Sequence, residues 1–124
     1  MLAVNPEAIG LFGLFATVMC FGLEQLGVGV KGADHEKLTR TLGYIAIFFG
    51  GFTQIFTSLC MYLFSVGGDH SIYLGTVFGF FGLFWVVVGF FFLKGGDKKV
   101  MAHFFLCGLI LVIAFTVRAF QDGL

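Results

Sequence analysis

Charged side chains are scarce in this sequence. Only 11% of the 124 residues are charged, and seven acidic residues balance seven basic ones. Soluble domains carry about 25% charged residues, and nucleic-acid-binding domains carry a clear excess of positive charge. The scarcity therefore excludes an ordinary soluble domain, and the zero net charge excludes a nucleic-acid binder.

Proline, cysteine and histidine are rare as well. The chain has one Pro, three Cys and three His. The cysteines lie in separate apolar runs without a CxxC spacing, which is typical of small packed side chains rather than of a disulfide framework. The histidines are scattered, and no Ser/His/Asp grouping indicates nucleophilic catalysis. We therefore expect no metal site, no cofactor and no enzymatic activity.

Hydrophobic residues make up 59% of the chain, and 19 of them are Phe. They gather in four runs, each close to the length of about 20 residues that a helix needs to cross a bilayer. The runs are too continuous for the alternating strands of a β-barrel, and backbone amides in lipid must be paired within their own segment. The sequence thus predicts an all-α, polytopic membrane protein, a single domain over residues 1–124 with about four transmembrane helices and short loops. The predicted spans are residues 8–27, 42–64, 72–93 and 100–120.

The loops predict an orientation. Six of the seven basic residues lie in the first and third loops: Lys31, Lys37, Arg40, Lys94, Lys98 and Lys99. The remaining one, Arg118, lies near the C-terminus. Because basic loops stay on the cytoplasmic side, loops one and three are predicted to face the cytoplasm or the mitochondrial matrix, with both termini on the other side.

Small residues recur at helical spacing in the second and third runs. Helices in lipid associate through small residues and polar contacts rather than through the hydrophobic effect. The residues predicted to pack helices together are Gly43, Gly50, Gly51, Gly75, Gly79 and Gly82.

Gln54 lies near the middle of the second span, with Thr57 nearby and Thr17 at a similar depth in the first span. An unpaired amide in hydrocarbon costs about 2–7 kcal/mol, so Gln54 must face another helix, a partner chain or a wet cavity. Two interpretations remain open. The amide either makes an interhelical hydrogen bond or is one polar position along a transport pathway.

Four segments in order resemble the acetate uptake transporter family, which includes the bacterial succinate–acetate permeases. NPEAIGLFGL (5–14) resembles the family's NPAPLGL-type signature, and IFFGGFTQIFTSLCMYLF (47–64) resembles its second helix with Gly-Gly-x-x-Gln. FGFFGLFW (78–85) is similar to an aromatic element of its third helix, and FFLKGGDKKVMAHFFL (91–106) to its LKG turn and following helix. Because family members usually have six spans, this chain would be a shortened relative.

The resemblance implies a pathway for a small monocarboxylate, typically acetate, in a ring-shaped homo-oligomer. On it, Asn5 shapes the entry to the first helix and Gln54 lines the route. Leu14 takes the position of a constriction Phe, and Phe81 takes the aromatic constriction position where relatives usually carry Tyr.

Two functions follow as hypotheses. The first is an acetate or small-monocarboxylate transporter or channel, proton-linked and oligomeric, because no span has a central Lys or Arg to stabilise an anion. The second is a non-catalytic accessory or structural subunit of a larger membrane complex, docking through its small-residue faces. In both, the partners are the lipid bilayer and either further copies of the chain or other membrane subunits.

Overall fold

The computed structural model describes residues 6–66 and 68–123, and these are helical apart from short turns, with no strand among them. The chain divides into two compact units, residues 1–94 and 95–124. Four helices are long and apolar enough to cross a membrane. This confirms the predicted all-α fold with four candidate membrane spans.

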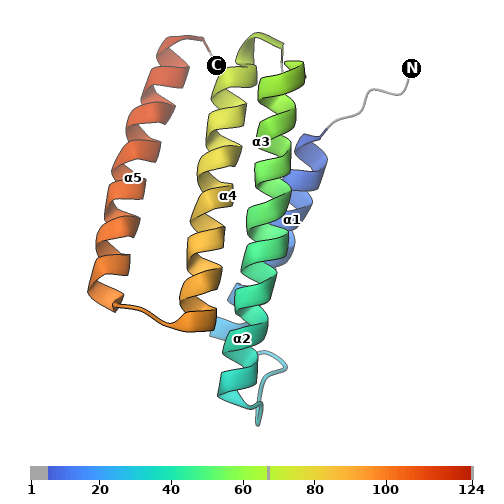
Figure 1. Ribbon diagram of the computed structural model, residues 1–124, viewed down its shortest axis with the longest axis vertical. Coiled ribbons are helices and arrows are strands. Elements are labelled where there is room, and N and C mark those ends of the chain that lie inside the picture. The colour runs from blue at the N-terminus through green and yellow to red at the C-terminus, as the bar shows by residue number, and fades with distance from the viewer. Residues whose placement is uncertain (1–5, 67, 124) are drawn as a thin grey trace. The chain divides into compact units, whose positions relative to one another are not determined.

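The N-terminal unit contains three long helical segments. The helix α1 (Glu7–Gln25) comes first, and α2 (His35–Ile45), the π-helix η1 (Ala46–Phe52) and α3 (Thr53–Phe64) then follow one another as a single continuous rod (Figure 1). A short 3-10 turn, η2 (Gly68–His70), leads into α4 (Ser71–Lys94). The second unit is the helix α5 (Lys98–Gln121) with its short flanks.

The helix ends follow local sequence signals. The Asp34 carboxylate accepts hydrogen bonds from the backbone N–H groups of Glu36 and Lys37, and Asp97 caps α5 through the N–H of Val100. Such caps satisfy N–H groups that have no partner within the helix. Gly95 follows α4 with a φ of 76°, a left-handed conformation that glycine adopts without strain.

The rod begins at His35, well before the predicted span of residues 42–64. Its first turns are polar, and they are held by the Asp34 cap and by an ion pair of 2.9 Å between Glu36 and Arg40, one helical turn apart. A hydropathy pattern detects only the apolar part of a helix, so it places the boundary where the polarity changes rather than where the helix starts.

Glycines allow α4 to pack closely against the rod. A Cβ built on Gly43 would lie 3.0 Å from the carbonyl oxygen of Gly89, and one built on Gly82 would lie 3.0 Å from that of Gly51. Each contact therefore pairs one glycine of the rod with one of α4, in antiparallel order. Because these positions lack side chains, the two backbones come within van der Waals contact, the arrangement typical of helices in lipid.

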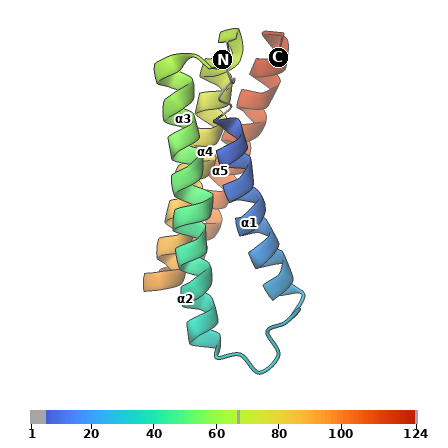
Figure 2. The same cartoon turned by 90° about the vertical axis from the view of Figure 1, so that its right-hand side faces the viewer.

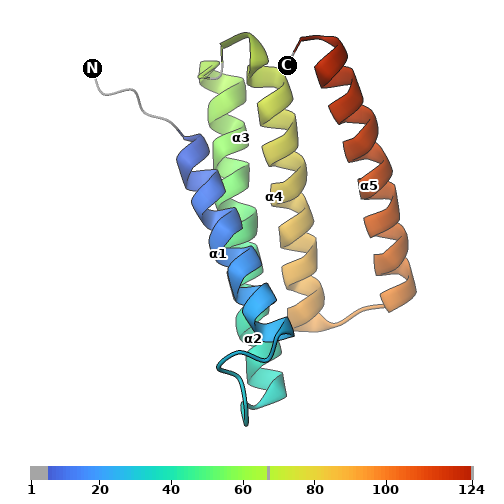
Figure 3. The ribbon, with the colours of Figure 1, turned by 180° about the vertical axis from the view of Figure 1, so that it is seen from behind.

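The helix α1 lies against η1 and α3 on the side seen in Figures 2 and 3. Its contact face is formed by Gly10, Gly13 and Thr17, the three residues of α1 that are buried. A Cβ on Gly13 would overlap the Thr53 hydroxyl oxygen and the Phe49 carbonyl oxygen. The close approach of α1 thus depends on glycine at position 13.

Candidate functional site

Polar side chains gather where α1 meets the rod. Thr17 and Thr57 are 0% exposed, and Gln54 is 1% exposed. The rest of the buried surface is formed mainly by glycine and apolar side chains. We call Thr17, Thr53, Gln54 and Thr57 the polar layer.

Each member of the polar layer donates to a backbone carbonyl one turn earlier in its own helix. Thr17 Oγ1 lies 2.8 Å from Gly13 O, Thr53 Oγ1 2.6 Å from Phe49 O, and Thr57 Oγ1 2.9 Å from Thr53 O. Hydroxyls often satisfy themselves in this way within helices. The hydroxyl groups of the layer therefore all have a hydrogen-bond acceptor within the bundle.

Thr57 also joins two helices. Its hydroxyl oxygen lies 2.9 Å from the carbonyl oxygen of Pro6, at the start of α1. That carbonyl also accepts the first backbone hydrogen bonds of α1, from the N–H groups of Ile9 and Gly10, and its second lone pair can receive the Thr57 hydroxyl. The single hydroxyl proton is shared between Pro6 and Thr53, so Thr57 ties the entry of α1 to α3.

Gln54 binds its own helix rather than a neighbouring one. Its Nε2 donates to the carbonyl oxygen of Gly50 over 2.8 Å. This differs from the interhelical bond that was one of the two sequence interpretations. The reason lies in the backbone. Gly50 belongs to the π-helix η1, and a π-turn disturbs the regular i→i−4 hydrogen-bonding pattern and so leaves carbonyls available for side chains.

Trp85 of α4 closes the layer opposite Gly50. A Cβ on Gly50 would lie 2.7 Å from Trp85 Cγ and 3.1 Å from Thr17 Oγ1, so all three residues converge. The indole Nε1 of Trp85 is buried and has no hydrogen-bond partner within the described part of the chain. The sequence predicts a partner for a deep indole. The structure places the Trp85 side chain against Gly50 and supplies no such partner among the described residues.

The constriction positions implied by the resemblance lie outside the polar layer. Leu14 and Phe81 are both half-buried. The Phe81 ring contacts the Phe84 ring with a centroid distance of 6.3 Å, and Phe84 in turn lies 5.5 Å from Trp85. Asn5 lies outside the described residues.

The glycines expected to pack helices lie at the interface between the rod and α4. Gly43, Gly50, Gly51, Gly75 and Gly82 are buried, and Gly79 is half-buried. Gly89 was not among the predicted packing residues, although Gly75, Gly82 and Gly89 recur at a spacing of seven. Such a heptad repeat keeps one face of a helix toward a partner helix. The repeat could therefore have identified Gly89 as a packing residue.

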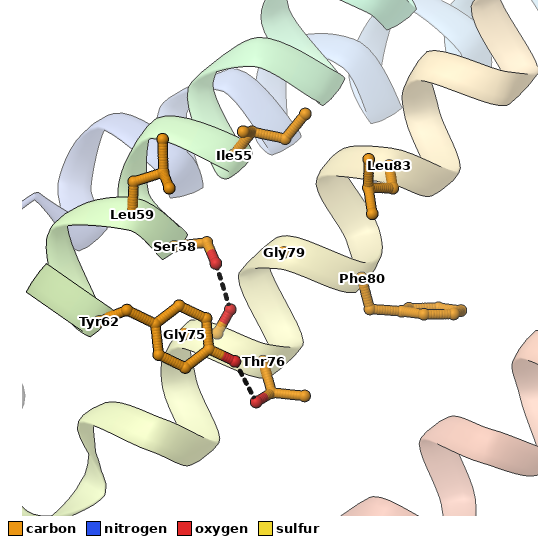
Figure 4. Close-up of a pocket in the computed structure, with 9 residues that line it drawn as sticks. All are labelled: Ile55, Ser58, Leu59, Tyr62, Gly75, Thr76, Gly79, Phe80 and Leu83. Carbon is orange, nitrogen blue, oxygen red and sulfur yellow. Dashed lines mark hydrogen bonds between the residues drawn. The ribbon is translucent and has the colours of Figure 1, made fainter.

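A groove of about 410 Å³ is lined by residues of α3 and α4 (Figure 4). Ser58 Oγ donates to Gly75 O over 2.6 Å along it, and the hydroxyl groups of Tyr62 and Thr76 bind each other. Since Thr76 already donates to Ile72 O, the Tyr62 hydroxyl is the donor in this pair. Apart from these bonds, the groove is mainly apolar.

Comparison with models of known protein families, with curated proteins and with solved structures finds no match to this chain.

Proposed function

We propose that the chain is a membrane transport protein for small monocarboxylates, with acetate as the first solute to test, and that it works as an oligomer. The observation that carries the proposal is the buried polar layer, beside which Trp85 packs against Gly50. Polar groups inside a membrane are costly and typically mark pathways. The sequence resemblance to the acetate uptake transporter family supports the same solute class.

The layer suits a neutral solute or an anion that moves with a proton. Its groups are hydroxyls and one amide, the neighbouring Trp85 adds an indole, and none of them carries a charge. The indole Nε1 is a donor without a partner among residues 6–66 and 68–123, and a carboxylic acid oxygen is a matching acceptor. An unaccompanied anion would lack a counter-charge here, which favours proton-linked movement.

In the structure the layer is closed, because Thr17, Gln54 and Thr57 are sealed between helices. A solute reaches them only when α1 moves away from α3. Glycines of α1 and the hydroxyl bond of Thr57 hold these two helices together, and Phe21 of α1 packs against aromatic rings of α4. Opening has to break these contacts, so the observed state would be the closed state of the proposed transporter.

The proposal is tested by uptake of labelled acetate into proteoliposomes with an inward proton gradient. Wild-type protein should exceed empty liposomes, and collapse of the gradient should reduce uptake. Gln54→Met keeps the side-chain length and removes the amide, so it should lower uptake severalfold with an unchanged melting temperature. Gln25→Met, at the exposed end of α1, is the matched control. Uptake equal to that of empty liposomes would refute the proposal.

A second function, a non-catalytic subunit of a larger membrane complex, is favoured by a different observation. Every side chain of the polar layer is already bonded to a backbone carbonyl, as expected for groups that only fix helix packing. On this hypothesis, gently solubilised protein migrates on native gels with other polypeptides. A self-contained ring of this chain that transports acetate would exclude it.

A further inference from the structure

The end of the N-terminal unit at which α2 begins and α4 ends contains a pocket of about 320 Å³. Its walls combine polar and apolar side chains. They are His35, Glu36, Thr39, Arg40, Phe92 and Leu93. This pocket is separate from the polar layer, and neither proposed function uses it.

Helix length places the pocket at the membrane surface. The rod from His35 to Phe64 has 30 residues, whereas about 20 residues cross the hydrocarbon core. The excess lies at the polar end, which begins with His35, and the other end remains apolar as far as Phe64. At an ideal rise of about 1.5 Å per residue, the turns from His35 to Arg40 lie at the depth of the lipid headgroups.

The end of α4 is held at the same depth by close packing. A Cβ on Gly43 would lie 2.9 Å from Leu93 Cγ and 3.0 Å from Gly89 O. Leu93 therefore lies against α2 near the position where the rod becomes apolar. Phe92 and Leu93 line the pocket together with side chains from the polar turns of α2. The pocket thus has an apolar wall toward the membrane and a polar wall toward the headgroups.

Arg40 supplies the dominant positive charge of the pocket. One of its Nη atoms lies 2.9 Å from a Glu36 carboxylate oxygen, and both side chains are largely exposed, at 59% and 80%. A guanidinium has five N–H donors in a planar fork, so most remain available to a second anion. Arginine is the preferred partner of phosphate because the fork matches two oxygens at once.

We propose that this pocket binds the phosphate group of an anionic membrane phospholipid, with Arg40 as the main donor, His35 as a second donor, and Phe92 and Leu93 against the start of the acyl chains. Basic pockets between helices at the membrane surface are known to hold such headgroups. The apolar wall favours a lipid over a free phosphate ion, because only the lipid has acyl chains that can contact it. Glu36 competes with the lipid phosphate for Arg40 and so limits its affinity.

Because Arg40 and Glu36 carry opposite charges, their substitutions should change lipid affinity in opposite directions. Detergent-solubilised full-length chain is titrated with phosphatidylglycerol and with phosphatidylcholine, and bound lipid is counted by native mass spectrometry. A charge-assisted hydrogen bond in a defined pocket contributes about tenfold or more in affinity. Arg40→Gln should therefore weaken phosphatidylglycerol binding about tenfold, and Glu36→Gln should strengthen it severalfold. Lys37→Gln, which removes a charge of the same helix outside the pocket, should change it less than twofold.

Because Glu36 and Arg40 are exposed, neither substitution should alter the melting temperature without lipid by more than a few degrees, and this is measured first. Equal effects of Arg40→Gln and Lys37→Gln would overturn the proposal by showing a diffuse charge effect. Weaker binding in Glu36→Gln would overturn it as well. Displacement of phosphatidylglycerol by an equal concentration of inorganic phosphate would show that the pocket takes phosphate alone, and it would refute the lipid assignment.

Discussion

At the scale of single residues, Gly13 decides how closely α1 approaches the rod. We expect Gly13→Ala to destabilise the protein, because its Cβ would overlap Thr53 Oγ1 and the fixed carbonyl oxygen of Phe49. Overpacking of this kind costs about 1–3 kcal/mol. Thermal unfolding in detergent measures it as a clear fall in melting temperature.

Gly22→Ala is the matched control, in the same helix. A Cβ there has no atom within 4 Å, and alanine favours a helix over glycine by about 1 kcal/mol. This variant should melt at the wild-type temperature or slightly above it. If the two variants melted at the same temperature, the close contact between α1 and the rod would be refuted.

Thr57 provides the second residue-scale prediction, because its hydroxyl group joins α3 to the start of α1. Thr57→Val keeps the shape and removes the bond to Pro6 O, and interhelical hydrogen bonds in membranes average about 0.6 kcal/mol with a maximum of about 1.7. We expect a loss within this range in unfolding titrations with a denaturing detergent. Thr41→Val removes an exposed hydroxyl that binds only its own helix and should lose less. The reverse order would contradict the role of Thr57.

At the scale of elements, the π-helix η1 sets the relative rotation of the two halves of the rod. A π-turn encloses one residue more than an α-turn. Deleting Phe48, an exposed residue of η1, should convert the π-helix into a regular α-helix. The buried faces of α2 and α3 would keep their orientation, so folding should persist.

Deleting Phe56, an exposed residue of the α-helix α3, is the matched control. It should rotate the residues after it by about 100° and turn Met61 away from α4. Yields of monodisperse protein in size-exclusion chromatography compare the two. A lower yield for the Phe48 deletion would contradict this reading of η1.

The sequence was sufficient for some elements and insufficient for others. Long apolar runs give the helices, since lipid permits little else, and the spacing of Gly43, Gly50 and Thr57 by seven predicts one face of the rod. The π-turn between them was not predictable, because it lies where Trp85 and Val86 of α4 pack against Gly50 and Gly51, and a contact between distant segments leaves no local sequence pattern. The hydrogen bond from Gln54 to Gly50 uses a carbonyl of this π-helix. The direction of the Gln54 amide was therefore not predictable from the sequence either.

At the scale of the whole molecule, the distribution of charge predicts which side of the membrane each loop faces. With four spans, the turn near Asp69 and the turn near Asp97 fall on opposite sides, and the basic residues around Asp97 should keep it inside. Asp69→Cys and Asp97→Cys are made separately in a background with Cys20→Ala, Cys60→Ala and Cys107→Ala. An impermeant maleimide added to intact cells or organelles should label position 69 at once and position 97 only after permeabilisation. Labelling of both positions before permeabilisation would mean an even number of crossings between them, and α4 would then not be a membrane span.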